Sequence, residues 1–150
     1  MLLGMMLSSC GTLQVFVSND TGFSRKTPIT ITNQPDPSGT VGILQFLLQT
    51  NGYKVISMDV AKKALNIDSN NSSHTEITST IDFKTAYVLT MDYTYYVDPI
   101  VSTNCGYHYF YATIVDLRSG ELILTATFRG DRQIDEVLEM FIKELNRINK

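Results

Sequence analysis

Apolar and polar residues alternate along several stretches of the chain, and this period of two predicts β-strands. Residues 13–17 alternate in this way, and residues 86–97 place Tyr87, Leu89, Met91, Tyr93 and Tyr95 on one face. Two further strands, 107–117 and 122–128, are separated by Arg118-Ser119-Gly120-Glu121. Because glycine accepts the positive φ that a tight turn requires, we expect a hairpin there. Shorter strands are predicted at 28–32, as an edge strand that begins with proline, and at 53–58.

A period close to 3.6 residues predicts helices in two places. The first helix carries Val41, Leu44, Leu47 and Leu48 on one side, with Asp36 as its cap and Pro37 in its first position. Asn51-Gly52 should end it, since glycine favours the left-handed conformation found there. The last helix follows Asp131, its predicted cap, and repeats apolar residues from Ile134 to Ile148. Asp59 is expected to cap a short helix over 59–65.

The order of these elements predicts a single α+β domain over residues 10–150. We expect a mixed five-stranded sheet in which a right-handed crossover pairs strands 13–17 and 53–58 in parallel. An antiparallel meander should extend this sheet, and the C-terminal amphipathic helix should pack on one of its faces. Residues 66–80 contain ten Ser, Thr or Asn residues and are predicted to form a polar loop within the domain.

Composition and charge exclude several classes of protein. The chain has 150 residues, of which 43% are hydrophobic and 18% charged, so it is neither a disordered acidic tail nor a coiled coil. A net charge of −3 argues against a nucleic-acid partner, because phosphate-backbone binders need concentrated basic charge. No apolar run approaches the roughly 20 residues of a membrane-spanning helix.

The first ten residues carry the most specific signal. They are uncharged and mostly apolar, and they end in Leu7-Ser8-Ser9-Cys10. This segment resembles the bacterial lipobox, in which an apolar residue and two small residues precede a cysteine. The resemblance implies that Cys10 is diacylated and becomes the new N-terminus. Two or three acyl chains anchor a domain stably, at about 0.8 kcal/mol per buried CH₂.

The lipobox resemblance also predicts a cellular location. Residues 1–9 lack the Lys or Arg that opens a secretory signal, so we interpret them as a truncated signal segment whose start lies upstream. Gly11-Thr12 is not followed by an acidic cluster, which favours a periplasm-facing position, preferably at the outer membrane. Strand-like alternation begins at Leu13, so the domain should sit close to the bacterial membrane.

A second, weaker resemblance concerns the rest of the chain. The segments Val15–Gly22, Asn51–Ile56 and Val115–Leu122 follow a pattern of strand, helix end and "Asp, turn, Gly-Glu" hairpin. This pattern is similar to small α/β domains of envelope-assembly lipoproteins, of the TolB amino-terminal, curli-secretion and penicillin-binding-protein-activator types. The resemblance implies protein binding or assembly without catalysis. It assigns no site residue, because these families share a shape and not a site.

Seven of the eight tyrosines fall between residues 87 and 111. Packing within the sheet is the default interpretation, since tyrosine favours strands and cross-strand aromatic pairs. The alternative is an exposed aromatic surface formed by Tyr96, Tyr107 and Tyr109, which would bind a glycan or a partner peptide.

Motifs for catalysis, cofactors or metals do not emerge from the sequence. His108, Cys105 and either Asp98 or Asp116 could be imagined as a thiol site, but their spacing does not establish contact. We therefore expect no enzyme activity, no cofactor and no metal site. The leading hypothesis is a lipid-anchored envelope module that binds another envelope protein. The alternative is a small-ligand or glycan-binding module that uses the tyrosine-rich hairpin.

Overall fold

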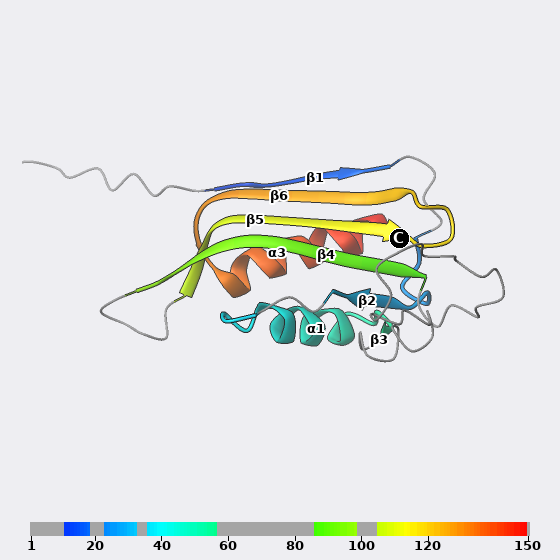
Figure 1. The fold of residues 1–150 in the computed structure, drawn as a ribbon, viewed down its shortest axis with the longest axis horizontal. Coiled ribbons are helices and arrows are strands. Elements are labelled where there is room, and N and C mark those ends of the chain that lie inside the picture. Colours follow the sequence, from blue (N-terminus) through cyan, green and yellow to red (C-terminus); the bar gives the residue numbers. More distant parts are fainter. Residues whose placement is uncertain (1–10, 19–22, 33–35, 57–85, 99–104, 150) are drawn as a thin grey trace, which may run out of the picture.

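The computed structural model describes residues 11–18, 23–32, 36–56, 86–98 and 105–149 (Figure 1). Six strands form one mixed sheet in the order β1-β6-β5-β4-β2-β3, and two helices accompany it. The elements are β1 (Leu13–Val17), β2 (Ile29–Ile31), α1 (Thr40–Thr50), β3 (Val55–Ile56), β4 (Tyr87–Val97), β5 (Cys105–Asp116), β6 (Leu122–Gln133) and α3 (Ile134–Ile148). The predicted signal segment 1–9, helix 59–65 and polar loop 66–80 lie outside the described residues.

The predicted α+β class with a mixed sheet is confirmed, but the count of five strands is wrong. The predicted partner of the first strand is also wrong. β1 does not pair with β3; it runs antiparallel to β6 at one edge of the sheet, with Leu13 opposite Phe128. The parallel neighbours joined through α1 are β2 and β3. Alternation specifies which side chains of a strand are buried, and it carries no information about which strand lies next to it.

β2 lies inside the sheet, although its proline suggested an edge. It runs parallel to both β3 and β4. Pro28 precedes the strand, so its missing N–H interrupts no ladder, and its carbonyl accepts hydrogen bonds from the N–H groups of Ala86 and Tyr87. Proline at the first position is therefore compatible with a central strand.

The helix caps predicted at Asp36 and Asp131 need correction. α1 begins at Thr40 after Gly39, whose φ is 73°. The Asp36 carboxylate nevertheless accepts a hydrogen bond of 2.8 Å from the N–H of Val41 and thus satisfies a donor of the first turn. Asp131 caps nothing, because β6 continues to Gln133 in order to pair with the start of β5. The predicted end of α1 is confirmed, with Gly52 at φ 82°.

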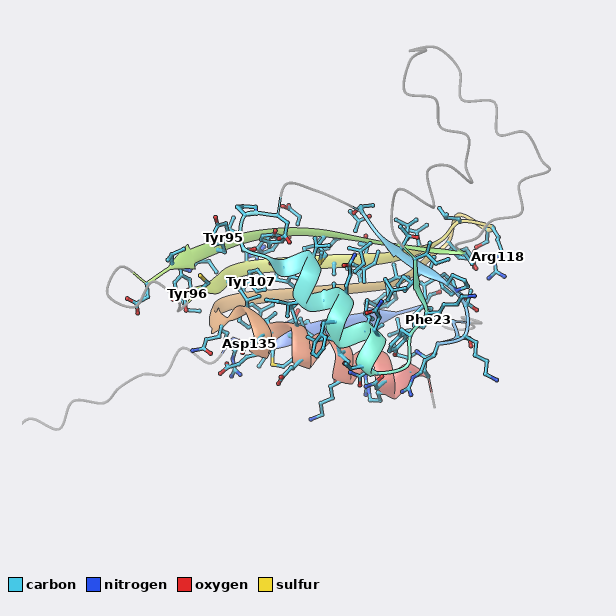
Figure 2. All side chains as sticks on the ribbon, turned by 90° about the horizontal axis from the view of Figure 1, so that it is seen from below. Phe23, Tyr95, Tyr96, Tyr107, Arg118 and Asp135 are labelled. Atoms are coloured by element: carbon cyan, nitrogen blue, oxygen red, sulfur yellow. The ribbon has the colours of Figure 1, made fainter. Side chains whose placement is uncertain are left out.

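The core lies between one face of the sheet and the two helices, which contact each other (Figures 1 and 2). α3 covers β6, β5 and β1, and the buried face of α3 contains the apolar residues that its periodicity predicted. Strand residues of the same sheet face complete the core. Its largest fully buried side chains include Tyr87, Tyr107, Phe110, Phe128, Phe141, Leu44, Leu48, Leu89, Ile114, Leu124 and Leu138.

Candidate functional site

The opposite face of β1, β6, β5 and β4 is polar and aromatic, and we call it the open face. The strand register aligns Gln14, Thr127, Tyr111 and Asp92 in one row across the four strands. The neighbouring row contains Arg129, Tyr109 and Thr94. These side chains are exposed or half-exposed. A surface of hydroxyl, amide, aromatic and charged groups is suited to binding and contributes little to a core.

Tyr107 does not belong to this surface, so the predicted surface of three tyrosines does not form. Its side chain is fully buried, and its hydroxyl lies 2.6 Å from the hydroxyl of Thr40 at the start of α1 (Figure 2). Burial strongly raises the pKa of Tyr107. The physical reason is a β-bulge: the register shifts between Tyr107 and Tyr109, which places Tyr107 and Phe110 on the same, core-facing side.

Tyr96 lies at the end of β4, where it packs tightly against its neighbours. Its ring covers Gly106, the residue opposite it on β5, and lies 4.9 Å from the ring of His108. His108 pairs through Nδ1 with the carboxylate of Asp131. Burial raises the pKa of Tyr96, and the carboxylates of Asp131, Asp98 and Glu136 raise it further. Tyr96 is thus half-covered and engaged with the protein itself.

Tyr109 remains on the open face beside a polar hollow. The guanidinium of Arg129 lies 6.0 Å from the centre of the Tyr109 ring. The hollow has a volume of about 380 Å³. It is lined by Thr12 just before β1, by Gln14 on β1, and by Thr127 and Arg129 on β6. All four of these side chains can donate hydrogen bonds, and none is a carboxylate. This arrangement suits a ligand with acceptor oxygens or negative charge.

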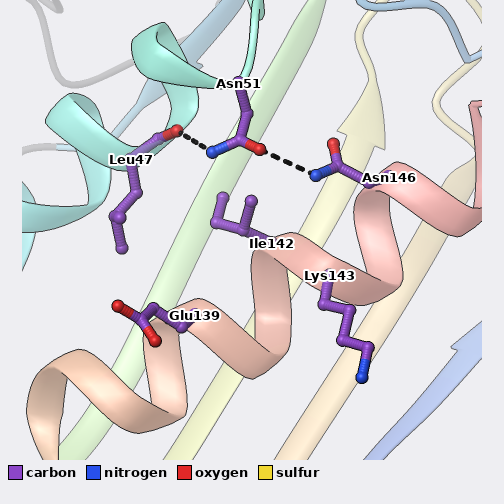
Figure 3. A pocket seen from close by; sticks show the side chains of 6 residues that line it. All are labelled: Leu47, Asn51, Glu139, Ile142, Lys143 and Asn146. Atoms are coloured by element: carbon purple, nitrogen blue, oxygen red, sulfur yellow. Dashed lines mark hydrogen bonds between the residues drawn. The ribbon is translucent and has the colours of Figure 1, made fainter.

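A second hollow, of about 340 Å³, lies between the two helices (Figure 3). Asn51 at the end of α1 donates to the carbonyl of Leu47 and accepts from the side-chain amide of Asn146 on α3. Glu139 and Lys143 lie along the same helix without an ion pair between them. The amides in this hollow already bond to one another and tie the two helices together, so these amides are not available to a ligand.

The structure separates the residues of the imagined thiol site. Cys105 has a free thiol and packs against the core, whereas His108 is exposed and pairs with Asp131. Asp116 pairs with Arg118 at the other end of β5. Within the described residues, no group of three His, Cys, Asp or Glu side chains is placed to hold a metal ion, and no helix is long and apolar enough to cross a membrane.

Sequence reasoning did not single out Thr12, Gln14, Thr127 or, as a binding residue, Arg129. The available signal was the alternation itself. Leu13, Val15 and Val17 face the core, so the polar side chains of Thr12 and Gln14 necessarily point to the other face. The pairing of β1 with β6 brings Thr127 and Arg129 beside them, and this pairing was not predicted.

Comparisons with known proteins bear on the fold. No known protein family matches the chain, and no curated protein sequence matches it. Among solved structures, a dodecamer of a PelC point variant from Paraburkholderia phytofirmans matches with a TM-score of 0.50 and 17% identity, covering 86% of this chain and 90% of that one. Lipoprotein GNA1162 from Neisseria meningitidis matches with a TM-score of 0.45 and 15% identity, covering 81% and 96%. The chain therefore shares the fold of PelC over most of its length.

Proposed function

We propose that this protein is a lipid-anchored lipoprotein of the bacterial cell envelope whose domain serves in assembly and does not catalyse a reaction. The observation that carries the proposal is Leu7-Ser8-Ser9-Cys10, placed directly before the first strand. Acylation of Cys10 would leave only Gly11 and Thr12 between the lipid and β1. Such a short tether holds the domain at the membrane surface, where it can organise neighbouring proteins.

The surface that supports an assembly role is helix α1. Its sequence, TVGILQFLLQT, contains no charged residue. Leu44 and Leu48 are buried against the core, but Phe46 is 64% exposed, and Ile43 and Leu47 beside it are only half-buried. An uncharged helix that exposes a large aromatic side chain on its outer side is typical of one that packs against something further.

We propose a second copy of this chain as the partner at α1. The solved PelC structure with this fold is a dodecamer, which makes self-assembly the first form of assembly to test. Other envelope proteins are the alternative partner. A closed assembly of copies would repeat the apolar contact around a ring.

The anchor is tested by replacing Cys10 with serine and fractionating cells that express the full chain. We expect the unaltered chain to be found in the membrane fraction and to incorporate radiolabelled palmitate. The Cys10→Ser chain should be released and unlabelled. Retention of this variant in the membrane fraction would overturn the anchor.

Assembly is tested on the released Cys10→Ser chain by size-exclusion chromatography with light scattering. We expect an oligomer that dissociates when Phe46→Glu places a charge in the apolar contact. Thr94→Glu is the matched control, since it adds the same charge to an exposed position of β4, on the face of the sheet opposite the helices. A monomer in all three chains would overturn self-assembly and leave another envelope protein as the partner to be sought.

Glycan binding remains the second candidate function, in a narrower form. Because Tyr107 is buried and Tyr96 is engaged with Gly106 and His108, Tyr109 is the one of the three predicted tyrosines whose ring remains available. It lies next to the donor-lined hollow of the open face. Titration of this hollow, described below, also tests this candidate.

A further inference from the structure

The polar hollow of the open face is built to receive an anion. Its lining offers the hydroxyls of Thr12 and Thr127, the amide of Gln14 and the guanidinium of Arg129. These groups lie on the same face of the sheet, along β6 and along β1 and the residue just before it. Arginine and hydroxyl donors together are the usual partners of phosphate oxygens.

The charge of Arg129 is not neutralised within the described residues. Its side chain is exposed, and its contact there is with the ring of Tyr109. Asp131, two residues further along β6, has another partner, since its carboxylate pairs with His108. The guanidinium of Arg129 is therefore available to a ligand.

The position of the hollow follows from two glycines, Gly11 just before β1 and Gly130 on β6. A Cβ on Gly11 would lie 2.5 Å from the carbonyl oxygen of Arg129, and a Cβ on Gly130 would lie 2.8 Å from the Cα of Gly11. Such close approach is possible only without side chains, so the chain enters the sheet directly beside Arg129. Cys10 is the next residue toward the N-terminus.

Simple distances then place the hollow relative to the lipid anchor. Only Gly11 separates Cys10 from Thr12, and the two steps along the chain span at most about 7 Å. The headgroup region of a bilayer is about 5–8 Å thick on each side of the hydrocarbon core. If Cys10 carries acyl chains, the hollow lies at the level of the lipid headgroups.

We propose that this hollow binds the anionic headgroup of a membrane phospholipid through its phosphate. The inference rests on the proposed anchor for its location and on the hollow itself for its chemistry. The acyl chains supply the strength of attachment. The headgroup contact fixes the orientation of the domain, with the start of β1 at the membrane and the β5–β6 turn at the opposite end of the sheet (Figure 1).

The test uses the full Cys10→Ser chain, labelled with ¹⁵N and titrated with dihexanoyl phosphatidylglycerol below its micelle-forming concentration. We expect amide shifts to concentrate at Thr12, Gln14, Thr127 and Arg129. The variant Arg129→Gln should weaken binding about fivefold, the effect of one basic side chain near an anionic lipid surface. Lys143→Gln, which removes an exposed positive charge from α3, should leave the binding unchanged. Equal weakening by both variants would indicate a general charge effect and overturn the site.

Three further measurements decide the source of the phosphate and the role of the fold. Inorganic phosphate should bind more weakly than the lipid, and equal binding would overturn a lipid headgroup as the ligand. An acidic oligogalacturonate that binds where the lipid does not would overturn the inference in favour of the glycan candidate. Gln14→Ala should also weaken lipid binding, and it provides a second variant if Arg129→Gln loses the dispersed spectrum of a folded chain.

The outcome is separable from that of the proposed function. The titration uses an unacylated chain, whereas the anchor is tested by fractionation of the unaltered one. A membrane-bound chain whose hollow ignores the lipid would overturn this inference alone. A hollow that binds the lipid in a chain that is never acylated would overturn the anchor alone.

Discussion

The two faces of the sheet are formed by the same strands but differ in almost every property. On the helix-covered face, β5 presents Phe110, Ala112 and Ile114, all fully buried. On the open face the alternate residues Tyr109, Tyr111 and Thr113 are half-exposed. Apolar side chains on the first face stabilise the fold through burial. The second face is not needed for a core, so its residue types are free to serve binding.

The two helices show the same contrast in a different form. Six of the fifteen residues of α3 are charged, and they keep its outer side in water: Asp135, Glu136, Glu139, Lys143, Glu144 and Arg147. α1 has no charged residue and leaves Phe46 exposed. Charged residues are typical of a helix side that faces solvent, whereas a large exposed aromatic side chain on an uncharged helix suggests a contact with another molecule. This difference is why we assign assembly to α1.

The largest effect is expected from a pair of substitutions at neighbouring positions of β5. Phe110→Ala removes a fully buried ring that packs against Tyr107 and Phe141, and should lower the free energy of unfolding by about 3–5 kcal/mol. Tyr111→Ala, one residue away on the open face, should lower it by less than about 1 kcal/mol. Urea unfolding of both variants measures the difference. Comparable losses would mean that the two faces are not distinct in energy.

The difference between the two faces of the sheet also shows how much the sequence could predict. Alternation in residues 86–97 and the period of the last helix assigned their buried sides correctly, because burial follows from side-chain geometry alone. The hairpin glycine was also predictable, and Gly120 has a φ of 74°. The candidate tyrosine surface could not be predicted. A single-residue bulge at His108 places Tyr107 on the core-facing side of the sheet, and nothing in the local sequence distinguishes a bulge from a regular strand.

Strand partners and caps were beyond the sequence for a related reason. β1 was expected beside β3, but its alternating pattern fits any neighbour with a matching buried face, and β6 is that neighbour. Asp131 has the residue type of a helix cap. It is equally acceptable on an exposed strand, where its carboxylate meets His108. Thr12 and Arg129 become neighbours only through the β1–β6 pairing, so the hollow required the structure.

A second prediction sharpens the comparison, because one place on the open face is as tightly packed as the core. A Cβ on Gly106 would lie 2.4 Å from the carbonyl oxygen of Arg132 and 2.5 Å from the ring of Tyr96. We expect Gly106→Ala to lower the free energy of unfolding by about 1–3 kcal/mol. Gly42→Ala in α1 meets nothing within 4 Å and should instead raise it by about 0.5–1 kcal/mol. Thermal unfolding that shows the same sign for both would contradict the packing described for Tyr96.

A third prediction concerns the polar contact inside the covered face. Tyr107→Phe keeps the ring but removes the hydroxyl that bonds to Thr40, whose own hydroxyl keeps a contact of 2.7 Å with Ser38. The expected loss is about 1 kcal/mol, the net value of a typical hydrogen bond. Tyr111→Phe is the control on the open face and should be nearly neutral. If the control cost as much in urea unfolding as Tyr107→Phe, the buried hydroxyl would have no special role.

The smallest effect is expected at the rim of the covered face, where Asp116 is buried beside the turn. Its carboxylate accepts hydrogen bonds from the backbone N–H of Arg118 at 2.8 Å and from the guanidinium at 2.6 Å. These contacts hold the pKa of Asp116 below its usual value. Because Arg118 is 57% exposed, solvent weakens the pair, and Asp116→Asn should cost less than about 1 kcal/mol at pH 7.

The pH dependence distinguishes this charge effect from a packing effect. The folded state holds Asp116 ionised more strongly than the unfolded state does, so its stabilisation is complete above the unfolded pKa of about 4. It declines as the pH falls through the lower pKa of the folded state. The stability difference between the unaltered chain and Asp116→Asn should therefore shrink between pH 7 and pH 2.5, whereas Asp92→Asn on the open face should change stability little at either pH. A difference that is the same at both pH values would show that Asp116 acts through shape, as its apolar neighbours on the covered face do.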